Sequence, residues 1–188
     1  MDKEAIIKNI ENTFLEKKNS HAFLFETNNI SKCYEDVLNI IKVITNHEYD
    51  NLIDNNNFPD LISVEPDGKE IKVFQIENII ETFSTTSIMG SYSIYIIKEA
   101  EKLNLSSANK ILKFLEEPEK NIVGFFITTS VSKILPTIKS RCELFKINYK
   151  FEDIKDVLSI TEEQYKYFEE TMDFAFKLNS TKKYILMN

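Results

Sequence analysis

Residues 94–129 read IYIIKEAEKLNLSSANKILKFLEEPEKNIVGFFITT, and this stretch decides the fold of the chain. It begins with a short apolar run at 94–97 and ends with another at 123–128. Between them, residues 105–115 carry apolar side chains at helical spacing, and Pro118 stops that helix because proline cannot donate a backbone hydrogen bond. A strand, a helix and a second strand in this order predict parallel strands joined by a crossover helix.

The same alternation continues on both sides of this stretch. The predicted strands lie at residues 22–26, 61–65, 94–97, 123–128 and 143–147. The predicted helices lie at residues 4–17, 31–45, 73–83, 105–115 and about 133–138. Residues 46–60 are polar and rich in Asn and Asp, which indicates a loop. We therefore predict an α/β fold over residues 1–148, with a five-stranded parallel sheet flanked by helices, followed by a helical segment at 149–188.

Composition limits the classes of function. The chain has 188 residues, a formal net charge of −7 and two cysteines. A protein that grips nucleic acid by itself usually shows a basic patch, so any work near DNA is expected to go through protein partners. No apolar run approaches the roughly 18 residues of a membrane span, and the charged N-terminus lacks the apolar core of a signal peptide. We expect a cytoplasmic protein with no membrane contact.

Several motifs follow one another in a fixed order. They are HAFLF at residues 21–25, FPDL at 58–61, IKVFQI at 71–76, SANKILKFLEEP at 107–118 and LPTIKSRC at 135–142. Their order and spacing resemble the clamp-loader branch of the AAA+ ATPases, and within it the bacterial DNA polymerase III delta-prime subunits. The resemblance runs from residue 21 to about 147, and such an ordered set is far more specific than any single motif.

The resemblance implies a P-loop NTPase-type, RecA-like AAA+ module over residues 1–148 and the start of a helical lid at 149–188. Family members carry a third, helical collar domain, for which this chain is too short. The implied partners are the other clamp-loader subunits, gamma/tau-like and delta-like, within a DNA polymerase III holoenzyme. The sliding clamp and primer-template DNA are reached through that assembly.

The phosphate-binding loop of the family is degenerate here. A working loop, G-x-x-x-x-G-K-[ST], uses glycines to bring backbone N–H groups around the phosphates. The equivalent stretch, ETNNISKCY, which includes Thr27, contains no glycine. Aligned without gaps, Lys32 takes the second glycine's place, Cys33 the lysine's and Tyr34 the hydroxyl's. A shift of one residue restores Lys32 as the lysine but leaves Cys33 where Ser or Thr belongs.

The strand end that holds magnesium in the family is altered as well. The family pattern D-E-A-D/E becomes KEAE at residues 98–101. Lys98 replaces the aspartate that helps hold the metal, and a cation cannot take that role. Glu99 matches the residue that polarises the attacking water, but without metal and phosphate it is better interpreted as a surface acid. Glu26 adds a negative charge near the phosphate position. We therefore expect no bound nucleotide, cofactor or metal.

Three further groups have structural as well as functional interpretations. Residues 46–60 contain no cysteine, so the family's four-cysteine zinc module is absent. Thr128 and Thr129 match the sensor-1 region, or serve as structural hydrogen-bonding groups. Glu116 and Glu117 are better interpreted as the end of a helix than as paired catalytic carboxylates, because nothing nearby supplies a nucleophile or a metal.

Ser140, Arg141 and Cys142 form the motif with the clearest functional prediction. In the family this arginine is an arginine finger that reaches into the neighbouring subunit's ATP site. Its planar, permanently charged guanidinium stabilises charge on the transferring phosphoryl group. The alternative is a structural arginine that caps the short helix ending near Lys139, through carbonyl groups that the helix end leaves free.

These observations leave three hypotheses for function. The first is a non-hydrolysing stator that helps position the clamp loader and completes one neighbouring ATP site, with no activity alone. The second is an active clamp-loader ATPase similar to gamma/tau, which needs an intact P-loop. The third is an AAA+-fold interaction module outside replication, which a pull-down of the other clamp-loader subunits would separate from the first.

Overall fold

A computed structural model describes residues 3–15, 21–84, 89–117 and 121–150, together with positions 161, 163, 166, 167 and 170. The chain separates into two compact units, residues 1–148 and 149–188. Nearly all of the described residues belong to the first unit, and the predicted helical segment of the second lies almost entirely outside them. Within the described part of the chain, every helix is too short or too polar to cross a bilayer.

Five parallel strands form one sheet in the order β2-β3-β4-β1-β5. In chain order the strands are β1 (Ala22–Thr27), β2 (Leu61–Val64), β3 (Ser93–Ile97), β4 (Ile122–Thr128) and β5 (Glu143–Ile147). All four strand pairings are parallel, so the predicted five-stranded parallel sheet is confirmed. β3 and β4 are buried along their whole length, which is why their sequences are continuous apolar runs rather than alternating ones.

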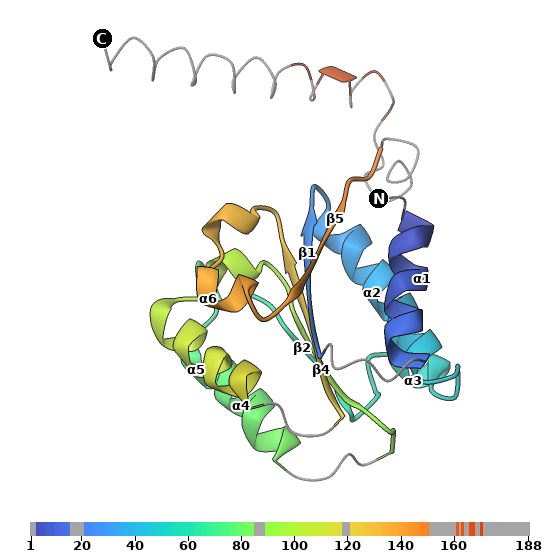
Figure 1. Cartoon of the computed structure of the whole chain (residues 1–188). Helices are drawn as coiled ribbons and strands as arrows, with labels where there is room; N and C mark the ends of the chain where they lie inside the picture. The colour runs from blue at the N-terminus through green and yellow to red at the C-terminus, as the bar shows by residue number, and fades with distance from the viewer. Residues whose placement is uncertain are drawn as a thin grey trace. The chain divides into compact units, whose positions relative to one another are not determined.

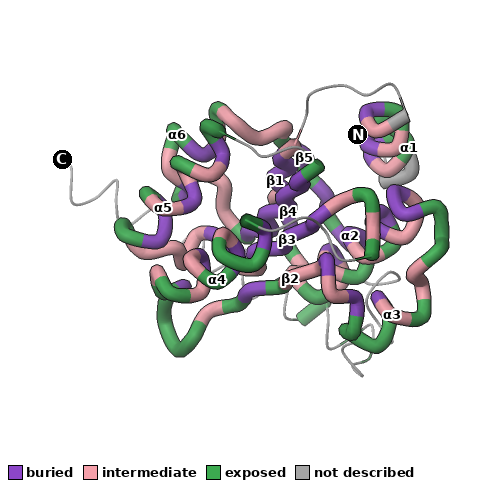
Figure 2. The backbone as a smooth tube through the Cα atoms, turned by 90° about the horizontal axis from the view of Figure 1, so that it is seen from below, coloured by how far each residue is buried: buried purple, intermediate pink, exposed green. Residues whose placement is uncertain are grey.

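Helices cover both faces of the sheet (Figure 1). One face carries α1 (Lys3–Leu15), α2 (Ile30–Ile44) and α3 (Asp50–Asp54). The other carries α4 (Val73–Phe83), α5 (Leu105–Glu116) and α6 (Pro136–Lys139). Two 3₁₀ turns, η1 (Ala100–Lys102) and η2 (Val131–Lys133), follow β3 and β4. Figure 2 shows the buried strands lying between helices whose outer surfaces are exposed.

Two predicted elements differ from the structure. Residues 46–60 were expected to form a loop but contain the five-residue helix α3. Ile53 of α3 is fully buried, and Asp54 forms an ion pair with Lys42 of α2 at 2.5 Å, so tertiary contacts hold a helix that the polar composition hides. The single helix predicted near 133–138 is two pieces, η2 and α6, because Pro136 at the first turn of α6 starts a new helix.

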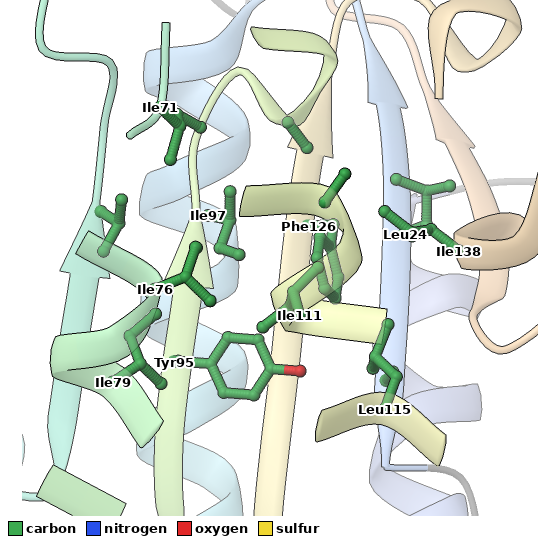
Figure 3. Close-up of a cluster of buried hydrophobic side chains, with 14 of the residues drawn as sticks. Leu24, Ile71, Ile76, Ile79, Tyr95, Ile97, Ile111, Leu115, Phe126 and Ile138 are labelled. Carbon is green, nitrogen blue, oxygen red and sulfur yellow. The ribbon is translucent and has the colours of Figure 1, made fainter. Parts of the chain in front are cut away.

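The core on the α4–α5 face is built around Tyr95 of β3 (Figure 3). Its ring lies among the labelled aliphatic side chains of that face and is 2% exposed. Gly124 of β4 stands directly opposite Tyr95, and a Cβ there would collide with the Tyr95 ring. Only glycine fits this position, which explains a glycine in the middle of a fully buried strand.

The opposite face of the sheet carries a ladder of aromatic side chains. Phe23, Phe25, Phe125 and Phe145 stack with ring centroids 5.4–6.4 Å apart across β4, β1 and β5. Phe14 of α1 joins them at 5.9 Å from Phe23. Burial of one such ring contributes about 1.5–3 kcal/mol. The two cores fix β1 and β4 in the centre of the sheet, and therefore fix the loops that leave their carboxyl ends.

Candidate functional site

The carboxyl ends of β1, β3 and β4 meet at one edge of the sheet, where ligands bind in open parallel sheets. Thr27 ends β1, Lys98 follows β3, and Thr128 ends β4. The tertiary structure thus brings together residues that the motifs singled out in three separate segments of the chain. We call Asn29, Tyr34, Lys98, Glu101 and Thr128, which line this edge, the carboxyl-edge cluster.

The turn between β1 and α2 is closed by its own side chains. Asn29 is the N-cap of α2, and its Oδ1 accepts a hydrogen bond from the Lys32 backbone N–H at 2.9 Å. The Asn29 N–H in turn donates to Thr27 Oγ1 at 3.1 Å. Lys32 Nζ bonds Glu35 at 2.7 Å, and Cys33 is fully buried. A helix N-terminus can bind an anion through its free N–H groups, but here a side chain takes one of those groups.

Lys98 is held between an aromatic ring and a carboxylate. Its Nζ lies 4.7 Å from the centre of the Tyr34 ring, within the range of a cation–π interaction. The same Nζ forms an ion pair with Glu65 Oε2 at 2.5 Å. Hydrogen bonding and charge from Lys98 hold the pKa of the Glu65 carboxyl below its usual value. The cluster therefore carries a fixed positive charge that comes from the chain itself.

Glu99 adopts a backbone conformation that glycine usually takes. Its φ and ψ are 52° and 50°, in the left-handed region. A non-glycine residue there costs on the order of 1 kcal/mol, and such strain is concentrated at functional sites. Its carboxylate is paired with Lys102 at 2.5 Å, and the side chain is 35% exposed. The Glu99 carboxylate thus has a partner from its own chain and lies partly exposed.

Glu101 joins η1 to the end of β4. Its carboxylate accepts hydrogen bonds from Thr128 Oγ1 at 2.6 Å and from Thr129 Oγ1 at 2.5 Å. Partial burial raises the pKa of Glu101, but the hydrogen bonds from both threonines outweigh it, so the net pKa is lowered. Thr128, fully buried, also accepts from the Ser130 N–H at 3.1 Å. Both threonines thus take part in a structural network with a carboxylate.

Glu26 at the end of β1 also faces partners from the chain. Its Oε1 accepts from the Val131 N–H at 3.1 Å, and its Oε2 pairs with Lys146 Nζ of β5 at 3.2 Å. The backbone hydrogen bond, followed by the contact with Lys146, lowers the pKa of Glu26. Among the described residues, His, Cys, Asp and Glu side chains nowhere gather in groups of three that could hold a metal ion.

Arg141 lies on a different edge, just after α6. Its Nη1 donates to the Thr137 carbonyl oxygen at 2.9 Å, a contact with its own short helix. Its Nη2 donates to Glu116 Oε1 of α5 at 2.7 Å. The Arg141 side chain is 33% exposed and that of Glu116 is 51% exposed. The contact with Thr137 is of the kind expected for an arginine that caps its own helix. The exposed third of the Arg141 side chain leaves the guanidinium accessible to solvent.

The residues beside Arg141 have supporting positions. Ser140 is exposed, and its Oγ donates to the Thr137 carbonyl oxygen at 3.0 Å. Cys142 packs against the α4–α5 core, and burial raises the pKa of its thiol to about 12. Cys142 is therefore a protonated, unreactive thiol at neutral pH. In the SRC motif, Cys142 is therefore anchored against the core, whereas the Arg141 cation is accessible.

Sequence reasoning missed three of these contacts. It gave Glu101 no role, although Glu101 is the fourth residue of the KEAE motif and so could have been singled out. It treated Tyr34 and Lys98 as two separate losses and did not pair them. It placed Glu116 and Arg141 in separate motifs, 25 positions apart, and only the packing of α5 beside α6 brings them together.

Comparison with known proteins gives one family for most of the chain. The family model described as DNA polymerase III, delta subunit, matches residues 2–151. The delta-prime subunit of DNA polymerase III from Bacillus subtilis is 43% identical over 91 residues, which are 48% of this chain and 28% of that protein. The tau subunit from the same organism is 29% identical over 153 residues, covering 76% and 27%. The chain thus spans less than a third of the length of these relatives.

Solved structures give the fold. A DNA polymerase III gamma subunit-related protein from Thermotoga maritima matches with a TM-score of 0.66 and 22% identity, over 80% of this chain and 49% of that one. A mutant of RuvB from Thermotoga maritima matches with a TM-score of 0.52 and 10% identity, over 82% and 47%. At these identities the likeness shows the fold alone, which is RecA-like.

Proposed function

The chain belongs to the family described as DNA polymerase III, delta subunit, and from that premise we propose that it is a non-hydrolysing, delta-prime-like stator of a clamp loader. It helps position the gamma/tau-like and delta-like subunits and offers Arg141 to a neighbour's ATP site. The sliding clamp and primer-template DNA are reached through the assembly, in the cytoplasm. Residues 1–148 are the AAA+ module, and residues 149–188 begin its helical lid.

The contact between Lys98 and Tyr34 carries the proposal that the chain does not hydrolyse ATP. In a working P-loop enzyme, a Ser or Thr hydroxyl and an acidic strand-end residue together hold magnesium. The ungapped alignment puts Tyr34 and Lys98 at those two positions, and their side chains meet at 4.7 Å. An ammonium group paired with Glu65 then takes the place of a metal cation. An ammonium has no lone pair to give to a metal, so Lys98 cannot serve as a magnesium ligand.

The N-terminus of α2 supports the same proposal. A P-loop leaves the helix N–H groups free for phosphate, because glycines carry no side chain that could compete. Asn29 instead caps the helix through the Lys32 N–H. Glu26 adds a carboxylate to the same edge, and its partners, Val131 and Lys146, belong to this chain. A triphosphate would have to displace the Asn29 side chain from the Lys32 N–H. Its negative charge would also approach the Glu26 carboxylate.

The active ATPase remains the second candidate, because the tau subunit match covers more of this chain than the delta-prime match. That function needs a lysine directed at the outer phosphates. Lys32 is the only lysine between residues 26 and 34, and its Nζ bonds Glu35. The two candidates differ in nucleotide affinity, which can be measured directly.

Titration calorimetry of the purified chain with ATP, with and without magnesium, separates them. A stator gives no binding at micromolar concentrations, whereas a gamma/tau-like ATPase binds ATP with magnesium dependence. Magnesium-dependent binding at micromolar ATP would contradict the non-hydrolysing proposal.

The role of Arg141 in trans is tested in a loader reconstituted with gamma/tau and delta subunits. Arg141→Ala is expected to slow ATP hydrolysis by the assembly, while Lys133→Ala, which removes another exposed cation, leaves it unchanged. Hydrolysis at the unmodified rate with Arg141→Ala would leave the helix-cap role of this arginine as the better interpretation.

A further inference from the structure

The guanidinium of Arg141 is held by two segments of its own chain. Nη2 donates to Glu116 at 2.7 Å, while Nη1 donates to the Thr137 carbonyl oxygen at 2.9 Å and lies 3.4 Å from Ser140 Oγ. Glu116 is the last residue of α5, and Thr137 and Ser140 belong to α6 and its end. The contact with Glu116 is therefore the one tertiary contact in this set.

The position of Glu116 matters because of the geometry of a guanidinium. Arginine binds a phosphate through two parallel N–H bonds, made either by Nε with Nη2 or by Nη1 with Nη2. Nη2 belongs to both pairs, and it is the atom that Glu116 contacts. A phosphate arriving at either edge therefore meets a carboxylate beside it, and two anions so close repel each other.

We propose that Glu116 is a latch that holds Arg141 against its own chain until the phosphate of a neighbouring subunit displaces it. The inference rests on the function proposed above, since it concerns the arginine offered in trans. Glu116 is a positioning residue in this proposal, because it acts on the reacting phosphate only through Arg141.

The exposure of the two side chains sets the strength of the latch. Arg141 is 33% exposed and Glu116 51%, so water screens the pair. Exposed ion pairs are weak, and the loss of one corresponds to about a twofold to fivefold change in an equilibrium. A latch of this strength keeps the cation in place in the free subunit, yet a doubly charged phosphate can displace it.

The test is steady-state ATP hydrolysis by a loader reconstituted with variants of this chain. Glu116→Gln keeps the size of the side chain and removes its charge, so we expect hydrolysis to rise about twofold to fivefold. Glu117→Gln is the matched control: it makes the same charge change one residue later, at an exposed side chain, and is expected to have no effect. Glu116→Asp keeps the charge and is expected to lie closer to the unmodified rate.

A merely structural role for Glu116 is separated by the double variant. If the latch acts through Arg141, the gain from Glu116→Gln disappears in the Arg141→Ala background, whereas a general effect on the subunit would persist there. Unchanged or slower hydrolysis with Glu116→Gln, while Arg141→Ala alone still slows it, overturns the latch and leaves the arginine finger standing. No effect of Arg141→Ala overturns the arginine finger itself, and the latch with it.

Discussion

Two regions of the molecule handle their polar groups in opposite ways. In the carboxyl-edge cluster, Lys98, Glu101 and Thr128 are bonded to partners from the same chain and lie partly or fully buried. At the α5–α6 edge, Arg141 has partners too, but one is the half-exposed Glu116 and the other is a carbonyl at the end of a four-residue helix. The side chains of the first region are paired and at least partly buried, whereas the ion pair of the second region is accessible to solvent.

The two regions differ in how much free energy their contacts contribute to folding. Hydrogen bonds to a partly buried charge contribute about 1.5–3 kcal/mol, whereas an exposed ion pair contributes about 0–1 kcal/mol. The cluster therefore serves folding, because its charges hold η1 and the ends of β3 and β4 in place. The α5–α6 edge contributes little to folding, because its ion pair is partly exposed to water. We therefore expect changes in the carboxyl-edge cluster to lower the stability of the chain. We expect changes at the α5–α6 edge to alter the ATPase activity of the assembly instead.

The largest expected effect is on hydrolysis in trans. Arg141→Lys keeps the charge but loses the planar fork, so we expect hydrolysis at the neighbouring site to fall by at least about tenfold, nearly as far as with Arg141→Ala. The free energy of unfolding of the same variant in urea should change by less than about 1 kcal/mol, because the Arg141 side chain is one-third exposed and its ion pair is screened by water. The measurements are phosphate release by the reconstituted loader and denaturation of the chain alone. A lysine that restores full activity would mean that position 141 supplies only charge.

The next effect is on stability, at Glu101. Glu101→Gln loses charged hydrogen bonds to Thr128 and Thr129, so we expect about 1–2 kcal/mol of destabilisation at pH 7. Since folding lowers the pKa of Glu101 below its ordinary 4.5, its contribution is complete above that pH and is lost as the pH falls below it. The difference between the two proteins should therefore shrink below about pH 4.5.

Urea denaturation from pH 7 down to the acid limit of folding checks this. Glu81→Gln, at an exposed position on α4, is the control and should shift stability by less than about 0.5 kcal/mol. A gap between unmodified protein and Glu101→Gln that widens in acid would show that folding raises the pKa of Glu101.

The smallest effect concerns Lys98. Lys98→Met keeps most of the side-chain volume but removes the cation over Tyr34 and the ion pair with Glu65, so we expect about 0.5–1.5 kcal/mol of destabilisation. Lys72→Met breaks an ion pair with Asp67 in which the lysine is 49% exposed, against 23% for Lys98, and should cost less than about 0.5 kcal/mol. Equal effects of the two variants in urea denaturation would show that the cation–π contact is worth nothing measurable.

Much of the fold could be predicted from local patterns. β2 and α4 have the predicted bounds or nearly so, and the order of strands and helices is as expected. The predictions failed where a distant contact decides a local structure, as in α3, which depends on buried Ile53 and on the pair between Lys42 and Asp54. For the site, the motifs singled out Tyr34, Lys98 and Arg141 but did not predict their partners. The trans role of Arg141 stays a prediction.

The sequence by itself determined the parallel sheet and the family, and it predicts a degenerate phosphate-binding loop with an altered strand end. These follow from periodicity and from the order of motifs, which need no knowledge of distance. Only the tertiary structure decided that Lys98 rests on Tyr34, that Gly124 makes room for Tyr95, and that Glu116 reaches Arg141. These pairs come from different elements, and their contact depends on strand register and helix packing, which no local pattern encodes.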